Sequence, residues 1–541
     1  MTIDTPPAAF GLHAGFLLSA HRHADRPALE VAGRQLSYAE LQELALAQAA
    51  VLVQSRPLHR PARVGILASR SQTVYTGLLG TLMAGCAVVP LNPSFPADRS
   101  LQMIVLADIG ALVVDAAGQV QLPALLDRLL APMLICLPGT VVDPDYAARW
   151  PQHHFVAMAS AMAPAGFHMA SVGPDSLAYL FFTSGSTGTP KGVGVLHRNA
   201  LRFVEMSVER YRACGIGEQD RFSQFYDITF DSSMFDLYVC WAFGACLCCP
   251  SNVDWVNPNK YIEAKALTVI DIVPSTGHAM NRSNGWRPGR FASLRLCRFG
   301  GEALSADLAM ALASAAPKAA IDNVYGPTEC TVDATYYRWN NERSPSECGH
   351  GIVPIGVAGP QVGLMVVDSS MREVPLGAEG ELLISGPQVT PGYWNSPERT
   401  AAAFVTLPGS NTVYYRTGDL VRRPAPGEAI PYLGRLDFQI KISGVRIELG
   451  EVEQSLRQAA GTELAVAVGW PPTTSGASGI VAFVVKPGVD LAAVRKQLKE
   501  MLPAVMVPKD IHVIAEMPLN VNGKVDRKAL LNSLIERSAK G

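Results

Sequence analysis

Excess charge of either sign is absent from this sequence of 541 residues, because 45 Lys and Arg stand against 47 Asp and Glu. The resulting net charge of −2 gives no general attraction to nucleic acid or to an anionic membrane surface. No apolar run approaches the roughly 20 residues that a membrane-spanning helix needs. The first ten residues contain Asp4 but no basic segment, so no secretory signal is expected. We therefore expect a cytoplasmic protein that binds neither nucleic acid nor membrane.

Paired cysteine motifs are also missing, although the chain holds ten cysteines. Cys246, Cys248 and Cys249 lie close together in an apolar run, but they have neither C-x2-C spacing nor interleaved histidines. A zinc site would need ligands at such spacing. We predict reduced thiols on a buried strand and no disulfide framework.

What is present describes a folded protein of several domains. Hydrophobic residues make up 48% of the chain and charged residues 17%, and the length exceeds what one hydrophobic core supports. Up to about Val332, short apolar runs alternate with helix-like segments, which predicts an α/β fold with parallel strands. The clearest predicted strands are Val64–Leu67, Cys86–Leu91 and Ala111–Val114. The clearest predicted helices are Leu36–Leu52 and Gln72–Ala84.

The pattern changes after Val332 and again after Gly434. Short β-rich runs separated by Gly and Pro predict a β subdomain over about residues 332–435, packed on two α/β subdomains that end at about 331. Residues 1–435 would thus form an N-terminal core, and residues 436–541 a small α+β C-terminal domain. The elements expected in these two regions are strands Val362–Asp368, Glu379–Ser385, Gln439–Ile442, Leu464–Gly469 and Ile480–Lys486, and helices Leu449–Gln458 and Leu491–Met501.

The strongest local signal is the segment Tyr179–Gly192, in which an apolar strand runs into a loop with three glycines, five hydroxyl residues and one lysine. Glycines let backbone N–H groups approach an anion, hydroxyls add donors, and the lysine adds positive charge. The loop is not a Walker A motif, because no Gly-Lys-Ser/Thr opens a helix. It predicts a polyphosphate site formed by Thr183, Ser184, Gly185, Ser186, Thr187, Gly188 and Lys191.

This loop resembles the phosphate-loop signature of the adenylate-forming (AMP-binding) superfamily. One match would be a weak signal, but six further motifs of that superfamily occur in the expected order over nearly the whole chain, two before this loop and four after it. They are Leu36–Leu41 and Met83–Pro90 (structural), Asn323–Glu329, Tyr415–Leu420 and Gly434–Asp437 (nucleotide site and hinge), and Asn522–Asp526 (C-terminal lysine).

The motif residues have chemistry that suits ATP and Mg2+. Tyr325 can stack on a purine, Thr328 can bond a phosphate, and Glu329 can hold Mg2+. Asp419 follows a Thr-Gly turn, where it can accept hydrogen bonds from both ribose hydroxyls. Taken alone, Asp419 would be interpreted as a turn-capping residue. The resemblance adds Gly326, Tyr432, Arg435 and Lys524 to the nucleotide site.

The resemblance implies a two-step reaction in which Lys524, Glu329, Thr328 and Lys191 are catalytic. A substrate carboxylate attacks the α-phosphorus of ATP and pyrophosphate leaves, a transfer that depends on positioning and charge neutralisation. Lys524 would bridge the carboxylate and the nucleotide. The adenylate then reacts with a thiol after the mobile C-terminal domain swings about a hinge at Asp437. This swing would remove Lys524 and bring the segment Lys441–Glu448 toward the thiol.

The stretch Phe225–Asp236 discriminates between branches of the superfamily. Its Phe230–Ser233 resembles the Phe-Asp-x-Ser core of amino acid adenylation domains of nonribosomal peptide synthesis, in which the aspartate pairs with the α-ammonium. A buried carboxylate needs such a cationic partner, so Asp231 is placed against the amino group of an amino acid substrate. Two alternatives stay open: Asp227 makes this contact instead, or Asp231 is a helix N-cap.

The remaining pocket residues are placed by position against the motifs. Gly300 and two valines indicate a pocket of modest size. Arg298 and Asp333 either pair and close the floor, or one faces the substrate, Arg298 selecting a carboxylate or Asp333 an ammonium or hydroxyl. A small polar α-amino acid, serine-like in size, is the favoured substrate. The predicted lining is Asp231, Ser232, Phe235, Thr276 (or Ser275), Arg298, Gly300, Val324, Val332 and Asp333.

A carrier domain and a phosphopantetheine attachment motif are not found in the sequence, and the 17 residues after Lys524 are too few for such a domain. We therefore expect a stand-alone ligase that loads a discrete carrier protein through its phosphopantetheine thiol. The alternatives are a carboxylate–CoA ligase acting on a non-amino acid, and a non-catalytic acyl-adenylate or nucleotide-binding module. The presence of Lys191, Glu329, Asp419 and Lys524 counts against the last of these.

Overall fold

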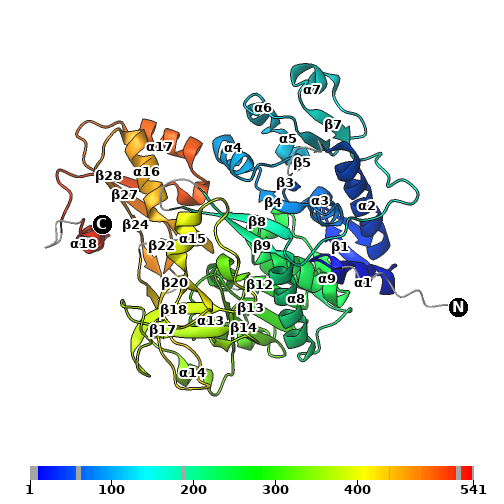
Figure 1. Ribbon diagram of the computed structural model, residues 1–541. Helices are drawn as coiled ribbons and strands as arrows, with labels where there is room; N and C mark the ends of the chain where they lie inside the picture. The colour runs from blue at the N-terminus through cyan, green and yellow to red at the C-terminus, as the bar shows by residue number, and fades with distance from the viewer. Residues whose placement is uncertain are drawn as a thin grey trace.

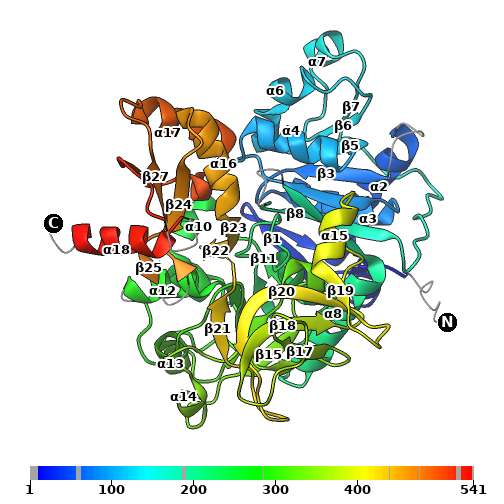
Figure 2. The ribbon, with the colours of Figure 1, turned by 60° about the vertical axis from the view of Figure 1, so that its left-hand side comes forward.

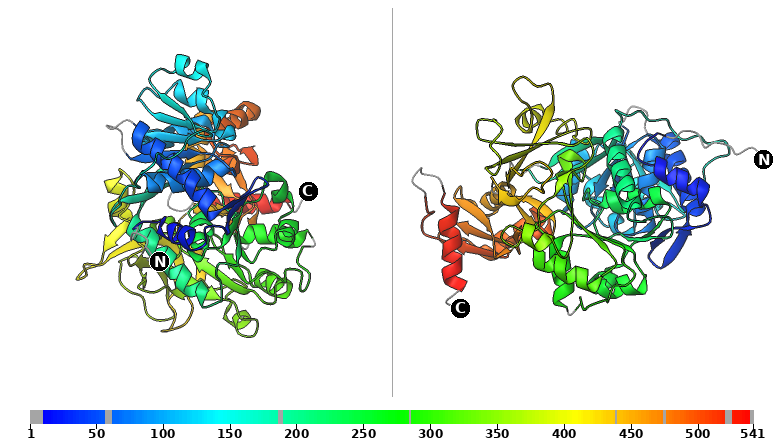
Figure 3. Two further views of the ribbon diagram at one scale, coloured as in Figure 1. Left: turned by 90° about the vertical axis from the view of Figure 1, so that its right-hand side faces the viewer. Right: turned by 90° about the horizontal axis from the view of Figure 1, so that it is seen from below.

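A computed structural model of the chain describes residues 10–56, 62–185, 190–283, 285–437, 439–473, 476–519 and 525–538. Two large sheets, a smaller β-sheet and their helices extend as far as strand β21, and a smaller α+β unit follows (Figure 1). The C-terminal unit lies at one end of the molecule and the N-terminal helices at the other (Figure 3). The predicted α/β multidomain class is confirmed, whereas the residues chosen as domain boundaries stay predictions.

The first large sheet has seven strands in the order β7-β6-β5-β3-β4-β8-β9, parallel except for β9. The central strands are apolar and buried, as expected where helices cover both faces of a parallel sheet. The three strands predicted from the early sequence form this centre. The strands are β3 Arg63–Leu67, β4 Ala87–Leu91, β5 Ala111–Val114, β6 Leu134–Leu137, β7 His154–Ala157, β8 Leu177–Thr183 and β9 Lys191–Leu196.

The second large sheet has nine strands in the order β16-β15-β14-β13-β12-β10-β11-β1-β2, with parallel pairing from β14 to β1. The cysteine cluster forms the buried strand β11, as predicted, and all ten cysteines are free thiols. The strands are β1 Pro27–Val31, β2 Arg34–Ser37, β10 Arg221–Ser223, β11 Cys246–Cys248, β12 Val269–Ile272, β13 Leu296–Phe299, β14 Ala320–Tyr325, β15 Thr335–Arg338 and β16 Val357–Ala358.

Residues of both large sheets share one apolar core with helices of the N-terminal region. The helix expected over Leu36–Leu52 begins later, at Tyr38, because Leu36 and Ser37 belong to β2. Ser37 caps the helix in a reciprocal pair with Glu40. The helices of this region are α1 Ala14–Arg22, α2 Tyr38–Ser55, α3 Gln72–Met83, α4 Ala97–Leu106, α5 Ala116–Gln119, α6 Leu122–Leu126, α7 Pro144–Arg149, α8 His197–Arg212 and α9 Cys240–Phe243.

Short helices connect the strands of the second sheet. One of them, η1 Phe235–Val239, is a π-helix that begins four residues after Asp231, and such turns often occur at functional sites. None of the described helices is both long and apolar enough to cross a membrane. The other helices of this region are α10 Asn252–Val256, α11 Pro258–Ala264, α12 Pro274–Arg282, α13 Ala306–Ala315, the 3-10 turn η2 Thr328–Cys330, and α14 Ser344–Glu347.

A smaller antiparallel sheet follows in the order β17-β18-β20-β19, with β21 also paired to β20. Strand β20 contains the motif Tyr415–Leu420, and β21 ends two residues before the predicted hinge residue Asp437. The elements are β17 Gly363–Val367, β18 Glu379–Ser385, α15 Pro397–Ala403, β19 Phe404–Thr406, β20 Val413–Arg422 and β21 Tyr432–Arg435.

The C-terminal unit begins with the hairpin of β22 Gln439–Ile442 and β23 Val445–Glu448, which leads into α16. Figure 2 shows this hairpin between the rest of the C-terminal unit and the two large sheets. Helices α16 and α17 and the β24-β27-β28 sheet share an apolar core. The remaining elements are α16 Leu449–Ala460, β24 Ala465–Gly469, β25 Pro472–Thr473, β26 Gly476–Ala477, β27 Ile480–Val484, α17 Leu491–Met501, the 3-10 turn η3 Ala504–Met506, β28 Asp510–Val513 and α18 Arg527–Ser538.

Candidate functional site

A cavity of about 410 Å3 lies where the two large sheets meet the C-terminal unit. It opens beyond the carboxyl ends of parallel strands, the usual place for a ligand in an α/β sheet. Residues after β8, β12, β13 and β14 line it on one side, and the β22–β23 hairpin lines it on another. The predicted site residues on its surface are Thr183, Ser184, Asp231, Ser232, Thr276, Arg298, Gly300, Val324, Tyr325, Gly326, Thr328, Val332, Asp333, Asp419 and Arg435.

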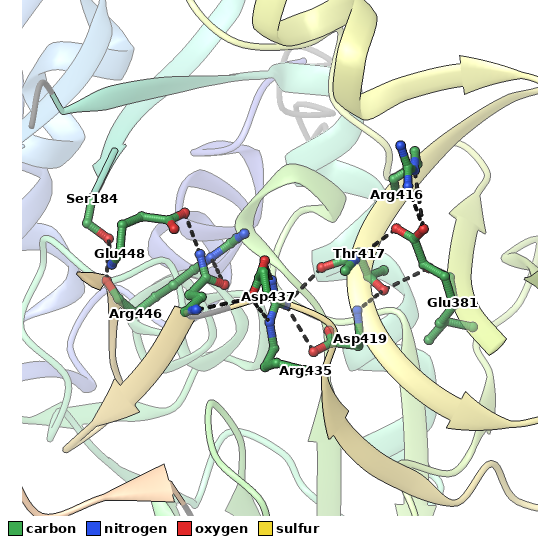
Figure 4. A network of polar contacts seen from close by, with 12 residues as sticks. Ser184, Glu381, Arg416, Thr417, Asp419, Arg435, Asp437, Arg446 and Glu448 are labelled. Atoms are coloured by element: carbon green, nitrogen blue, oxygen red, sulfur yellow. Dashed lines mark hydrogen bonds and ion pairs between the residues drawn. The ribbon is translucent and has the colours of Figure 1, made fainter. Parts of the chain in front are cut away.

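One end of the site is a polar network centred on Asp419 (Figure 4). The Tyr325 hydroxyl donates to Asp419 Oδ2 at 2.6 Å, and Arg435 Nη1 donates to Oδ1 at 3.0 Å. The Tyr432 hydroxyl lies 3.4 Å from the same Oδ1. Asp419 and Arg435 face each other across the β20–β21 pair, so strand register brings together residues that the sequence separates. The network can hold a ribose beside an aromatic ring.

Two glycines are required by close approaches around this network. Gly418 has φ +68°, and a Cβ there would lie 2.8 Å from Arg435 Nη2. A Cβ on Gly326 would lie 2.2 Å from the Val332 carbonyl oxygen. Any other residue at either position would therefore push apart the segments that form the site.

The phosphate loop contacts the C-terminal unit in this structure. Ser184 Oγ donates to the Arg446 carbonyl at 2.7 Å and accepts from the Glu448 N–H at 3.1 Å. The Gly185 N–H donates to Glu451, which also pairs with Arg99 of α4 at 2.5 Å. Carboxylates and a carbonyl of the C-terminal unit thus occupy donors predicted to bind phosphate. The predicted loop residues Ser186, Thr187 and Gly188, and likewise Lys524, lie outside the described residues.

Glu329 is fully buried beneath the loop and does not line the cavity. Its Oε1 accepts from the Tyr393 hydroxyl at 2.7 Å, and its Oε2 pairs with Arg446 at 2.9 Å. Lys191 Nζ lies 4.0 Å from Oε1. Although burial opposes ionisation, Arg446, Lys191 and Tyr393 lower the pKa of Glu329 to about 2.

These contacts test whether the predicted Mg2+ ligand fits its role. A carboxylate is a suitable ligand, but both Glu329 oxygens have protein partners, and the described residues contain no cluster of His, Cys, Asp and Glu that could hold a metal. Glu329 fits a Mg2+ site only after Arg446, which belongs to the hairpin, has withdrawn.

Asp231 lines the cavity between the nucleotide end and the predicted side-chain pocket. Burial raises its pKa to about 6, although a hydrogen bond with Thr328 opposes this shift. The competing residue Asp227 is already satisfied, because Oδ2 accepts from Asn92 at 3.0 Å and Oδ1 accepts from the Thr229 N–H and hydroxyl. Of the two carboxylates, Asp231 is the better placed to receive a cation.

The floor of the cavity is a buried ionic cluster. Arg298 Nη2 donates to Asp333 Oδ2 at 2.5 Å, so of the two alternatives left by the sequence the ion pair is the one that this structure contains. Asp271 of β12 lies on the other side of Arg298, with Oδ2 3.6 Å from Nη1. Phe235, predicted to line the pocket, lies instead beneath the Arg298 guanidinium, 3.6 Å from ring centroid to Cζ, and is not on the cavity surface.

The two residues at the uncertain pocket position have different roles. Thr276 is on the cavity surface, whereas the Ser275 hydroxyl and N–H both donate to Glu302. Asp271 was missed, although a lone acid within the apolar run Val269–Ile272 is a signal that the sequence offers. Arg446 and Lys441 were anticipated only as members of a mobile segment.

A second cavity, of about 590 Å3, lies between the core and the C-terminal unit. It is lined by Glu302, Tyr432 and Asp437 on the core side and hinge, and by Lys441 and Lys528 on the other. Lys441 also lines the first cavity, so the two meet at this side chain. Burial lowers the pKa of Lys441. A flexible arm entering through the second cavity would reach the first at Lys441.

Known proteins resemble this chain over most of its length. The model of the AMP-binding enzyme family matches residues 16–394, and that of the AMP-binding enzyme C-terminal domain matches residues 451–524. A solved adenylation domain, AlmE of Vibrio cholerae in complex with glycyl-adenosine-5'-phosphate, is similar with a TM-score of 0.87 and 28% identity. The match covers 99% of this chain and 100% of AlmE.

Two curated relatives are much longer than this chain. Tyrocidine synthase 3 of Brevibacillus parabrevis is 34% identical over 97% of this chain, which spans 8% of that protein. Phenyloxazoline synthase MbtB of Mycobacterium tuberculosis is 32% identical over 98% of this chain, which spans 35% of it. The chain therefore corresponds to about a third or less of the length of these relatives.

Proposed function

The chain belongs to the AMP-binding enzyme family, and from this membership we propose that it activates a small polar α-amino acid as its adenylate and passes it to the phosphopantetheine thiol of a discrete carrier protein. The family assignment confirms the superfamily predicted from the motifs, and its members use ATP. The observation that carries the proposal is the position of Asp231, a carboxylate with no cationic partner among the described residues, between the Asp419 network and the pocket.

In the proposed first step, Asp231 holds the α-ammonium and so directs the substrate carboxylate toward the nucleotide end. Asp419 and Tyr325 hold the ribose and base, and the phosphate loop with Lys191 binds the polyphosphate. Lys524 then bridges the two reacting anions. When bound at Glu329, Mg2+ supplies neutralisation of phosphate oxygens, which requires that Arg446 has left that carboxylate.

In the proposed second step, the C-terminal unit has the placement seen in this structure. The hairpin with Lys441 and Arg446 faces the first cavity, and the second cavity gives a thiol a route to the adenylate. The relatives named above support an amino acid as substrate, and the glycyl adenylate of AlmE supports a small one. The free cysteines fit a reducing, cytoplasmic compartment.

Pyrophosphate exchange across matched amino acids and plain carboxylic acids tests the proposal. We expect ATP–pyrophosphate exchange with one or a few small polar α-amino acids and none with the corresponding acids that lack the amino group. Exchange with plain acids alone would favour a carboxylate–CoA ligase. Nucleotide binding without exchange for any acid would favour a non-catalytic module.

A further inference from the structure

The floor of the amino acid cavity carries a residue that no motif includes. Resting on the proposed function, we propose that Asp271 is a specificity-determining residue. With Arg298, it selects a neutral substrate side chain that ends in a hydroxyl or a carboxamide.

Strand register places the two side chains together. Asp271 on β12 is the direct partner of Arg298 on β13, so both side chains leave the sheet on the same face. Both line the cavity, and each is at most 2% exposed. Asp333, which also lines the cavity, pairs with Nη2 of the guanidinium, and the Phe235 ring packs against its plane. The cavity-facing ends of Asp271 and Arg298 are therefore presented by a rigid support.

Unsatisfied polar atoms remain at this floor. Within the described part of the chain, Asp271 Oδ1 and Arg298 Nε and Nη1 have no hydrogen-bond partner. The ion pair between Nη1 and Asp271 Oδ2, at 3.6 Å, is too long for a hydrogen bond. Buried donors and acceptors without partners are costly and rare, and a water or a bound ligand is one way to satisfy them. Here the unpaired donor and acceptor belong to two neighbouring residues that line the cavity.

Because the floor offers a donor on Arg298 and an acceptor on Asp271, it discriminates between the possible substrate side chains. An apolar side chain would leave both unsatisfied. An ammonium could donate to Asp271 but would face the Arg298 cation. A carboxylate could accept from Arg298 but would face Asp271, with Asp333 and the buried Asp236 close behind. A hydroxyl or carboxamide can donate to Asp271 and accept from Arg298 at once.

The lateral walls limit the size of this group. Gly300, Val324 and Val332 line the cavity above the floor, and a Cβ on Gly300 would lie 3.0 Å from Val324 Cγ2. The space at Gly300 is thus closed by a valine rather than left for a bulky side chain. A short polar side chain reaches the floor without displacing these residues.

Matched substrate pairs on the wild-type chain give the first test. Pyrophosphate exchange would be measured for Ser against Ala, Asn against Asp, Gln against Glu, and homoserine against 2,4-diaminobutyrate. We expect kcat/KM at least tenfold higher for a neutral polar member than for its apolar or charged partner. Whether Ser and homoserine or Asn and Gln are preferred distinguishes hydroxyl from carboxamide. A preference for an apolar, acidic or basic side chain overturns the proposal while leaving amino acid activation intact.

The variant Asp271→Asn, assayed at pH 8, gives the second test, because its amide can donate where the ionised Asp271 only accepts. The ratio of kcat/KM between a neutral substrate and its acidic isostere should fall at least tenfold. Asp333→Asn removes the same charge from the other side of Arg298 and should change this ratio much less. Equal changes in both variants would mean that the cluster acts through charge alone and would overturn direct recognition by Asp271. Exchange with no amino acid at all would remove the proposed function and this inference together.

Discussion

The pKa of each carboxylate in the site is set by its burial and by the charged groups beside it. Burial raises the pKa of Asp231 to about 6 and that of Asp271 to about 7, because neither has a close cation that fully compensates. Glu329 is just as buried, yet its pKa falls to about 2, because Arg446 and Lys191 lie beside it. The sequence shows only that three acidic residues are present. Their neighbours in the fold decide which of the three carboxylates has no close cation and can bind the ammonium group of a substrate.

Asp231→Ala should weaken the binding of the amino acid and spare that of ATP. The α-ammonium would lose its partner in a desolvated site, a loss of about 2–5 kcal/mol by analogy with buried charge pairs. Amino acid KM and the Kd of ATP, measured separately, check this. The matched control is Asp175→Ala, which removes an exposed carboxylate with a surface ion pair. Unchanged amino acid affinity in Asp231→Ala would redirect attention to Asp227.

The raised pKa of Asp231 predicts a pH dependence. Below about pH 6 the free enzyme carries a protonated Asp231, which no longer attracts the α-ammonium, so kcat/KM for the amino acid should fall about tenfold per pH unit. It should become level only above about pH 7, where Asp271 is ionised as well. If the Asp271→Asn variant keeps the fall in kcat/KM near pH 6, the titrating group is Asp231. If the fall disappears in this variant, the titrating group is Asp271.

At the scale of elements, the β22–β23 hairpin depends on its turn. Gly444 has φ +78°, donates its N–H to Glu302 at 2.6 Å, and would place a Cβ 2.5 Å from Val273 Cγ1. Any side chain at this position therefore both strains the turn and pushes the hairpin from the cavity.

Gly444→Ala should slow transfer to the carrier thiol at least tenfold while leaving pyrophosphate exchange within about twofold. Single-turnover transfer of preformed adenylate would measure the second step. Gly488→Ala is the matched control, since Gly488 also has φ +73° but has open space around its Cβ position. Equal effects of the two substitutions on transfer would show that turn strain, rather than docking of the hairpin, is responsible.

At the scale of the whole molecule, the two steps should be separable. Lys524→Ala should reduce adenylate formation by several orders of magnitude, because this lysine neutralises charge mainly in the transition state, and should affect thiol transfer far less. Together with Gly444→Ala it forms a complementary pair measured by exchange and transfer assays. Equal loss of both steps in Lys524→Ala would count against a swing of the C-terminal domain about Asp437.

The docked C-terminal unit and the polyphosphate should compete. Glu451 takes the Gly185 N–H and pairs with Arg99, while Glu448 lies 3.4 Å from Lys191. The Gly185 N–H and Lys191 are predicted to bind the phosphates of ATP. Pyrophosphate should therefore compete with the two glutamates for these groups, displace the C-terminal unit and inhibit thiol transfer.

Glu451→Gln should weaken this docking, since a neutral amide pairs poorly with Arg99, and inhibition by pyrophosphate should appear at several-fold lower concentration. Limited proteolysis at the hinge, with and without pyrophosphate, gives a readout independent of activity. Glu500→Gln, on the exposed side of α17, removes the same charge without touching the core. Identical pyrophosphate sensitivity in both variants would contradict competition at Gly185.

The sequence alone determined the fold class, the centre of the seven-stranded sheet and the superfamily, because these depend on local patterns: buried apolar runs, turn glycines and short motifs. It left two alternatives for Arg298 and Asp333, pairing with each other or contact with the substrate, and the structure contains the pair. Only the tertiary structure decided that Phe235 lies beneath Arg298, that Asp271 joins the floor through the β12–β13 register, and that Arg446 holds Glu329. Each of these is a contact between segments far apart in the chain, and such contacts are set by strand register and domain placement, which no local pattern encodes.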